Sequence, residues 1–192
     1  MKFALRPRKL LLGAALACAA ATIPAVAVAA SAGQSAPEAR EGAAAPPRCV
    51  RSQLTAWAAV PSDGLAALTA YYDLEISNIS RHACTLKGFA DVTALNDTGG
   101  QLGSPAGRVP LYRARPVAIA PGGTAHYQLG ITVGGWSTSV CRPTTAYALR
   151  VVAPGTHGGI QVPFSFTACA KRGPVYLTVT AVVANTGIPR YN

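Results

Sequence analysis

The chain has 192 residues, a formal net charge of +10 at pH 7 and a hydrophobic fraction of 50%. From Arg48 onward, 12 lysine and arginine residues outnumber five acidic residues, and they are dispersed without a run of like charge. The chain shows no recognition helix and no aromatic RNA-binding motif, which argues against nucleic acid as a partner. The excess positive charge is either a solvated surface or an attraction for an anionic partner, such as a cell-wall polymer or lipid headgroups.

Residues 1–30 are typical of a secretory signal peptide. Four basic residues lie within the first nine positions, and an apolar run starts at Leu10 and is interrupted by Pro24 before small residues end it. This layout predicts a secreted protein, cleaved near residue 30. Cys18 offers an alternative, because lipid attachment there would tether the protein to the outer face of the cytoplasmic membrane.

Residues 31–47 contain no aromatic and no branched aliphatic residue. Such a segment buries too little apolar surface to offset the entropy of ordering it, so it is predicted to be a disordered linker. Residues 48–192 have the length of one domain with one core.

Four cysteines follow the predicted linker: Cys49, Cys84, Cys141 and Cys169. An even number in an exported chain predicts disulfides. Two alternating arms flank the turn-like sequence "APGTHGG", and a hairpin folded at Gly155 places Cys141 nearly opposite Cys169. Cys49 is then left to pair with Cys84. Metal ligation is the disfavoured alternative, because no two cysteines are close in sequence.

Alternation with a period of two recurs along the chain and predicts strands with one buried and one solvated face. The longest runs span residues 68–76, 125–133, 147–151, 162–166 and 175–183. Turn-like sequences such as "NISR", "NDTGG" and "KRGP" separate them. Seven to nine strands predict an all-β, immunoglobulin-like antiparallel β-sandwich with two disulfides. Trp57 is expected in its core.

The order of these segments carries a family resemblance. Cys49 is followed by "LEISNIS", then by "CTLKGFADVTALNDTGGQLG" and "VAIAPGGTAHYQL", and the last two cysteines flank "VPFSF". This resembles the exported actinobacterial domain-of-unknown-function family 4232, over essentially the whole predicted domain. The resemblance implies an immunoglobulin-like sandwich and export, often on a lipid anchor. It implies no activity, since the family has none assigned.

The sequence presents no recognisable catalytic, cofactor or metal motif. It has no G-x-S-x-G, its histidines are not spaced as a metal pair, and it has a single methionine, Met1. The sequence therefore predicts a protein that is not an enzyme. The alternative is a secreted hydrolase assembled only in the fold, with His82 or His126 acting together with Asp91.

Three residues are candidates for binding. Arg113 and Arg115 are two apart in "LYRARP" and would project to one side of an extended segment. Trp136 lies in a glycine- and serine-rich loop, where an aromatic ring either anchors a partner or sugar or folds back over the core. The preferred hypothesis is an exported, non-catalytic binding or interaction module of the cell surface or cell wall, and a structural or inhibitory module is a further alternative.

Overall fold

The computed structural model describes residues 44–59 and 65–185. The predicted signal peptide and residues 31–43 of the predicted linker lie outside the described residues. Within them, strands account for every regular element except one short 3₁₀ helix, η1 (Arg51–Gln53). No helix in this described part is long and apolar enough to cross a membrane.

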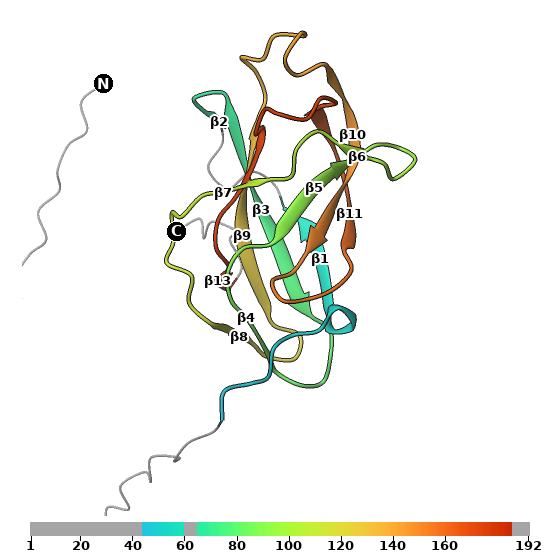
Figure 1. The fold of residues 1–192 in the computed structure, drawn as a ribbon. Helices are drawn as coiled ribbons and strands as arrows, with labels where there is room; N and C mark the ends of the chain where they lie inside the picture. The colour runs from blue at the N-terminus through green and yellow to red at the C-terminus, as the bar shows by residue number, and fades with distance from the viewer. Residues whose placement is uncertain (1–43, 60–64, 186–192) are drawn as a thin grey trace, which may run out of the picture. The chain divides into compact units, whose positions relative to one another are not determined.

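Most strands belong to two sheets, which form a sandwich (Figure 1). The larger sheet has the order β1-β3-β9-β12-β7, with β2 added beside β3 and β13 beside β9. Its strands are β1 (Leu54–Ala58), β2 (Leu65–Ala66), β3 (Thr69–Asn78), β7 (Gly107–Arg108), β9 (Thr124–Thr132), β12 (Leu177–Val179) and β13 (Val183–Ala184). The smaller sheet has the order β11-β10-β5-β6. Its strands are β5 (Asp91–Leu95), β6 (Gln101–Leu102), β10 (Pro143–Val152) and β11 (Ile160–Cys169).

Two further strands, β4 (Cys84–Leu86) and β8 (Val117–Ile119), pair with each other near one end of the sandwich. All strand pairs are antiparallel except β7 with β12. The all-β sandwich with two disulfides is thus confirmed. The described residues form thirteen strands, more than the expected seven to nine, because several strands are only two or three residues long and show no alternation in sequence.

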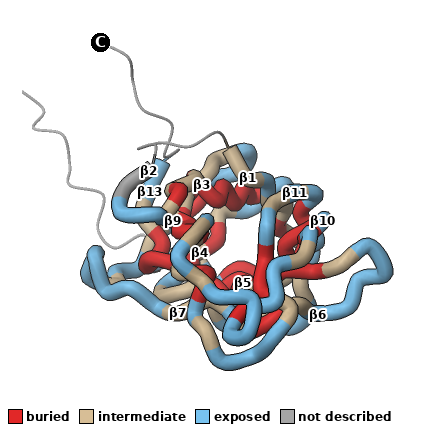
Figure 2. Tube along the Cα trace, turned by 90° about the horizontal axis from the view of Figure 1, so that it is seen from above, coloured by how far each residue is buried: buried red, intermediate tan, exposed pale blue. Residues whose placement is uncertain are grey.

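The core lies between the inner faces of the two sheets, as the buried middle of Figure 2 shows. Branched aliphatic residues dominate it, because they fit a pleated surface and lose little side-chain entropy on burial. Its fully buried side chains include Leu74, Ile76, Tyr127, Leu129 and Ile131 from the larger sheet, and Val92, Leu149, Val151 and Val162 from the smaller one.

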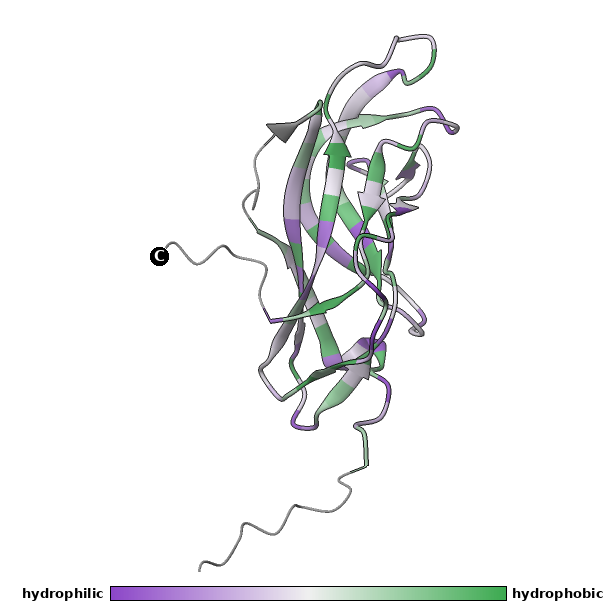
Figure 3. Ribbon diagram, turned by 90° about the vertical axis from the view of Figure 1, so that its left-hand side faces the viewer, coloured by the Kyte–Doolittle hydropathy of each residue, from purple (hydrophilic) through white to green (hydrophobic). Residues whose placement is uncertain are grey.

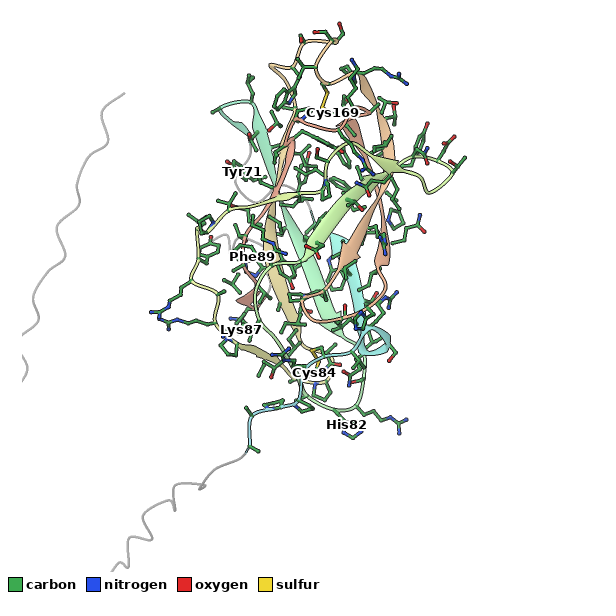
Figure 4. All side chains as sticks on the ribbon, in the orientation of Figure 1. Tyr71, His82, Cys84, Lys87, Phe89 and Cys169 are labelled. Carbon is green, nitrogen blue, oxygen red and sulfur yellow. A yellow bond between two sulfur atoms is a disulfide. The ribbon has the colours of Figure 1, made fainter. Side chains whose placement is uncertain are left out.

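The two disulfides have the predicted pairing and lie at opposite ends of the sandwich. Cys49 is bonded to Cys84 and Cys141 to Cys169. Figure 4 places Cys84 and Cys169 at the two ends of the long axis of the strands. Neither bridge joins the two large sheets: one ties the segment before η1 to β4, and the other closes the β10–β11 hairpin.

The register of that hairpin differs from the prediction. Cys169 lies opposite Pro143 in the ladder, and the register shifts between Ala146 and Ala148. The bulge turns Tyr147 outward, where 54% of it is exposed. Cys141 still reaches Cys169, with their Cα atoms 4.7 Å apart, because the chain bends at Arg142, whose φ is 50°.

The prediction that each strand has one solvated face is wrong for β3. Asp73 and Glu75 are 3% and 0% exposed, and Ser77 is also buried. Their register partners on β9 are Gln128, His126 and Thr124. Figure 3 shows such hydrophilic bands within the strands as well as on the loops. The period of two correctly predicted the strand, but it did not show that its polar face is covered.

Two other core assignments are corrected. Trp57, expected in the core, is 41% exposed. The predicted strand over 175–183 is interrupted, and only β12 and β13 are regular within it. At its start the predicted alternation fails, since Val175 is 51% exposed whereas Tyr176 is buried, but Leu177 and Val179 are buried as predicted.

Two buried tyrosines differ in how their hydroxyl groups are satisfied. The Tyr176 hydroxyl donates to the Leu102 carbonyl at 3.0 Å. The Tyr127 hydroxyl has no hydrogen-bond partner among the described residues, although the side chain is completely buried. A buried unsatisfied polar group costs free energy, whereas a satisfied one contributes modestly to stability.

We expect Tyr127→Phe to stabilise the domain by about 1 kcal/mol, because it removes an unsatisfied hydroxyl without creating a cavity. Tyr176→Phe is the matched control, and it should cost about 1 kcal/mol because it breaks a hydrogen bond. Urea denaturation of both variants measures the difference. Equal destabilisation by the two substitutions would contradict this prediction.

Burial raises the pKa of Tyr176 to about 12, and it raises the pKa of Tyr127 further. The native state therefore holds these protons more tightly than the unfolded chain, whose tyrosines titrate near 10. The stabilisation is complete below pH 10 and is lost as the pH rises through 12. Over that interval the unfolding free energy should fall more steeply for the wild type than for the Tyr127→Phe/Tyr176→Phe double variant.

Candidate functional site

A hollow at the Cys84 end of the sandwich is built on the segment that enters the domain. Pro47 accepts a hydrogen bond from the Thr85 amide at 2.8 Å, and the Cys49 amide donates to the Thr85 carbonyl at 3.1 Å. The Thr85 hydroxyl also donates to the Pro46 carbonyl. Together with the Cys49–Cys84 disulfide, these bonds hold the segment across β4. The backbone of Arg48, which forms an isolated bridge with Thr85, is therefore fixed.

The hollow has a volume of about 320 Å³. We call it the basic groove, and its lining is Ala45, Pro46, Arg48, Thr85, Lys87, Pro116, Pro154 and Gly155. The lining comes from the entering segment, the end of β4, the start of β8 and the β10–β11 loop. Figure 4 shows Lys87 near the Cys84 end. The volume lies at the small end of the range for ligand sites, so the groove suits a headgroup or one unit of a polymer.

Glycine is required where the β10–β11 loop approaches Arg48. Gly155 has a φ of +75°, which other residues rarely adopt. The Arg48 guanidinium lies 3.8 Å from the position that a Cβ atom of Gly155 would occupy. A larger residue there would strain the loop and narrow the groove beside the cation.

The charge of the basic groove is not neutralised from within its lining. Arg48 and Lys87 are both exposed and no acidic residue lines the groove. The ion pair between Arg108 and Asp91, at 3.1 Å, does not involve the groove lining. Two exposed cations at a concave surface attract an anion over about one Debye length, roughly 8 Å at physiological ionic strength.

A second hollow adjoins the groove and shares Gly155. Its lining includes Arg51, Thr156 and His157. The Arg51 side chain is partly used by the fold, since it donates to the Gly159 carbonyl at 3.1 Å and to the Leu54 carbonyl at 3.2 Å. Arg51 therefore adds positive charge beside the groove while it fixes η1 against the β10–β11 loop.

The predicted arginine pair lies in a loop. Arg113 and Arg115 are exposed in the connection between β7 and β8, outside any strand. Neither lines the basic groove, but Arg115 directly precedes Pro116, which does. Both arginine side chains are accessible, and Arg115 is the sequence neighbour of a residue that lines the groove.

Trp136 lies at the other end of the sandwich. It is half-buried, packs against the core and lines a separate pocket beside the Cys141–Cys169 disulfide. The structure therefore does not bring Trp136 together with Arg113 or Arg115 in one site.

The residues considered for the alternative hydrolase lie on different elements and have different neighbours. His126 lies in the larger sheet, where its Nδ1 is 2.9 Å from the Asn185 carbonyl. Asp91 lies in the smaller sheet and pairs with Arg108. His82 is exposed in the turn after β3. In the described part of the chain, no hydrogen bond joins either histidine to Asp91, and no group of three or more metal-ligating residues is found.

Arg48 and Lys87 were not among the predicted binding residues, although a signal for them was present. Arg48 precedes Cys49, and Lys87 follows Cys84 by three positions. Once Cys49 pairs with Cys84, both cations are brought to the same end of the fold. The predicted disulfide therefore implied that Arg48 and Lys87 lie close together.

Comparison with known protein families shows a match over most of the domain. A family model described as a domain of unknown function (DUF4232) matches residues 49–183. No curated protein and no solved structure matches the chain.

We expect the Cys49→Ala/Cys84→Ala variant to lose about 4 kcal/mol of stability, because the bridge closes a 35-residue separation. The Cys141→Ala/Cys169→Ala variant, with a 28-residue separation, should lose a similar amount. Only the first variant should also speed hydrogen exchange at the amides of Thr85 and residue 49. Mass spectrometry under native conditions measures that exchange, and faster exchange there in both variants would contradict the assignment.

Proposed function

We propose that this chain, which belongs to domain-of-unknown-function family 4232 (DUF4232), is an exported, non-catalytic module that binds an anionic component of the cell envelope. The basic groove of Arg48 and Lys87 is the proposed site. The observation that carries the proposal is a concave surface with two exposed cations and no acidic lining residue.

Export is supported by three features. The first 30 residues have the layout of a signal peptide, and a polar, alanine-rich linker follows them. All four cysteines of the domain are paired in disulfides, which persist in oxidising compartments outside the cytosol. The alternative of a lipid anchor at Cys18 would keep the same domain at the membrane surface.

The position of the groove suits a tethered module. Its lining begins at Ala45, within the last residues of the predicted linker, 31–47. Figure 1 shows the first described segment, coloured blue, at the same end as β4 and β8. An anchor or linker leads from this end, so the cations of the groove are the part of the domain that remains nearest to the point of attachment.

The ligand class follows from the chemistry of the lining. Two cations and proline rings offer charge and apolar contact, whereas the Thr85 hydroxyl already donates its proton to the Pro46 carbonyl. Phosphate or carboxylate groups repeated along a polymer, or the phosphates of lipid headgroups, fit this combination. The proposed role is binding, because the residues considered for hydrolysis have separate partners in the described part of the fold.

The test is cosedimentation of the mature domain with poly(glycerol phosphate) coupled to beads, and with vesicles containing phosphatidylglycerol. We expect Arg48→Ser/Lys87→Ser to weaken retention roughly tenfold, because each exposed ion pair contributes up to about 1 kcal/mol. Raising the salt concentration should weaken wild-type retention as well. Retention on beads alone identifies a polymer, and retention on vesicles alone identifies a lipid surface.

Lys171→Ser/Arg172→Ser is the matched control, since it removes the same charge at the Cys169 end. Arg113→Ser/Arg115→Ser tests the pair predicted from the sequence, and thermal unfolding of each variant checks that the fold is kept. Equal losses in all three double variants would show that net charge alone acts, and that outcome would refute the groove as the site. Absence of retention at low salt would refute the proposed function.

A further inference from the structure

The basic groove and the hollow that adjoins it are lined by the same two segments of the chain. The first is the entering segment, residues 45–52, which places Arg48 in the groove and Arg51 in the adjoining hollow. The second is the β10–β11 loop, whose residues 154–157 contribute to both linings. Gly155 itself lines both hollows. The two hollows are therefore parts of one depression, which we call the basic trough.

The fold holds both segments of the basic trough in place. The Arg51 Nε atom donates to the Gly159 carbonyl at 3.1 Å and so joins the entering segment to the β10–β11 loop. Within the loop, the Thr156 hydroxyl donates to the Ala153 carbonyl at 2.8 Å. The entering segment is also fixed to β4 by its backbone hydrogen bonds and its disulfide. The trough is therefore formed before a ligand arrives, which lowers the entropic cost of binding.

The two hollows meet at Gly155, which has no side chain to separate them. A Cβ atom built at this position would lie 3.8 Å from the Arg48 Nη1 atom, its nearest contact beyond the neighbouring residues. A larger side chain would project from here into the trough beside the guanidinium. With glycine at this position, an extended anionic chain has room to cross from one hollow to the other, and it passes a cation as it does so.

Positive charge is present in both parts of the trough. Arg48 and Lys87 line the groove, Arg51 lines the adjoining hollow, and neither lining contains an acidic residue. Arg51 keeps its full charge, because the Gly159 and Leu54 carbonyls to which it donates are neutral. The adjoining hollow has a volume of about 600 Å³, against about 320 Å³ for the groove. A ligand with a single anionic unit would leave one of the two hollows unused.

We propose that the basic trough binds a linear polyanion, whose repeated phosphate or carboxylate groups occupy both hollows at once. This inference rests on the proposed function and narrows its ligand to a polymer. A chain that places successive anionic groups near Lys87, Arg48 and Arg51 gains from each cation. After the first contact, the next group binds at a high effective concentration, because it is on the same chain. A lipid headgroup carries its charge at one point and lacks this gain.

His157→Glu tests the adjoining hollow, because it adds a negative charge to that lining and leaves the cations in place. His82→Glu is the matched control, since His82 is also exposed, lies at the Cys84 end and lines neither hollow. Calorimetric titration of the mature protein with poly(glycerol phosphate) and with polygalacturonate measures binding. We expect His157→Glu to weaken binding of at least one polymer about threefold relative to His82→Glu, because charges at an exposed site interact modestly.

Gly155→Asn tests the junction by steric means. Asparagine tolerates a positive φ, so the loop keeps its course while a side chain enters the trough. Gly158→Asn is the matched control, because Gly158 has a φ of +80° in the same loop and lines neither hollow. We expect Gly155→Asn to weaken polymer binding severalfold and Gly158→Asn to leave it unchanged. Thermal unfolding of both variants checks that the fold is kept.

The same titrations separate this inference from the proposed function. If Arg48→Ser/Lys87→Ser loses the polymer but His157→Glu or Gly155→Asn binds it as well as its control, the groove alone is the site. That result would overturn the spanning ligand and leave the proposed function standing. Displacement of the polymer by glycerol phosphate at an equal phosphate concentration, or retention on phosphatidylglycerol vesicles alone, would have the same meaning. Absence of binding to every anionic probe would refute both.

Discussion

The pairing of β3 with β9 is the constraint on which the other elements depend. Its ladder runs without interruption from Thr69↔Thr132 to Ser77↔Thr124. This register turns residues such as Leu74 and Tyr127 toward the smaller sheet. Because side chains alternate, a slip by one residue would exchange them for Asp73 and Glu75 and place carboxylates in the core. Such an exchange is prohibitive, so the register is strongly specified and β1, β12 and β13 assemble on its edges.

With the middle of the sandwich fixed by burial, the disulfides act at its ends. Each one anchors an irregular segment that hydrophobic packing alone would hold weakly: the strand-like segment around Arg48 at one end, and the loop of Trp136 at the other. Irregular segments carry exposed side chains in positions that strands do not offer. The two bridges therefore help to shape the basic groove and the Trp136 pocket, since each of these has a bridged cysteine in its lining or next to it in the chain.

The period-two alternation predicted the all-β class and the main strands, and the number and spacing of the cysteines predicted both disulfide pairs. It could not predict features that depend on what covers a surface. The alternation that identified β3 assigned Asp73 and Glu75 to solvent, although both are buried. It assigned Trp57 to the core from its size alone, although its side of β1 is partly open. The groove cations were overlooked because Arg48 and Lys87 are 39 residues apart in the chain, and they are brought together by the disulfide and by the backbone pairing of Arg48 with Thr85.

The two ends of the sandwich differ in charge, and charge acts over a longer range than direct contact does. Under the proposed function, the cations beside the entering segment would attract a polyanion before contact and tolerate many geometries, because charge acts over roughly 8 Å at physiological ionic strength. The lining of the pocket at the Cys169 end holds no charged side chain, so that pocket has no comparable long-range attraction and would select a group only by contact, through shape and hydrogen bonds.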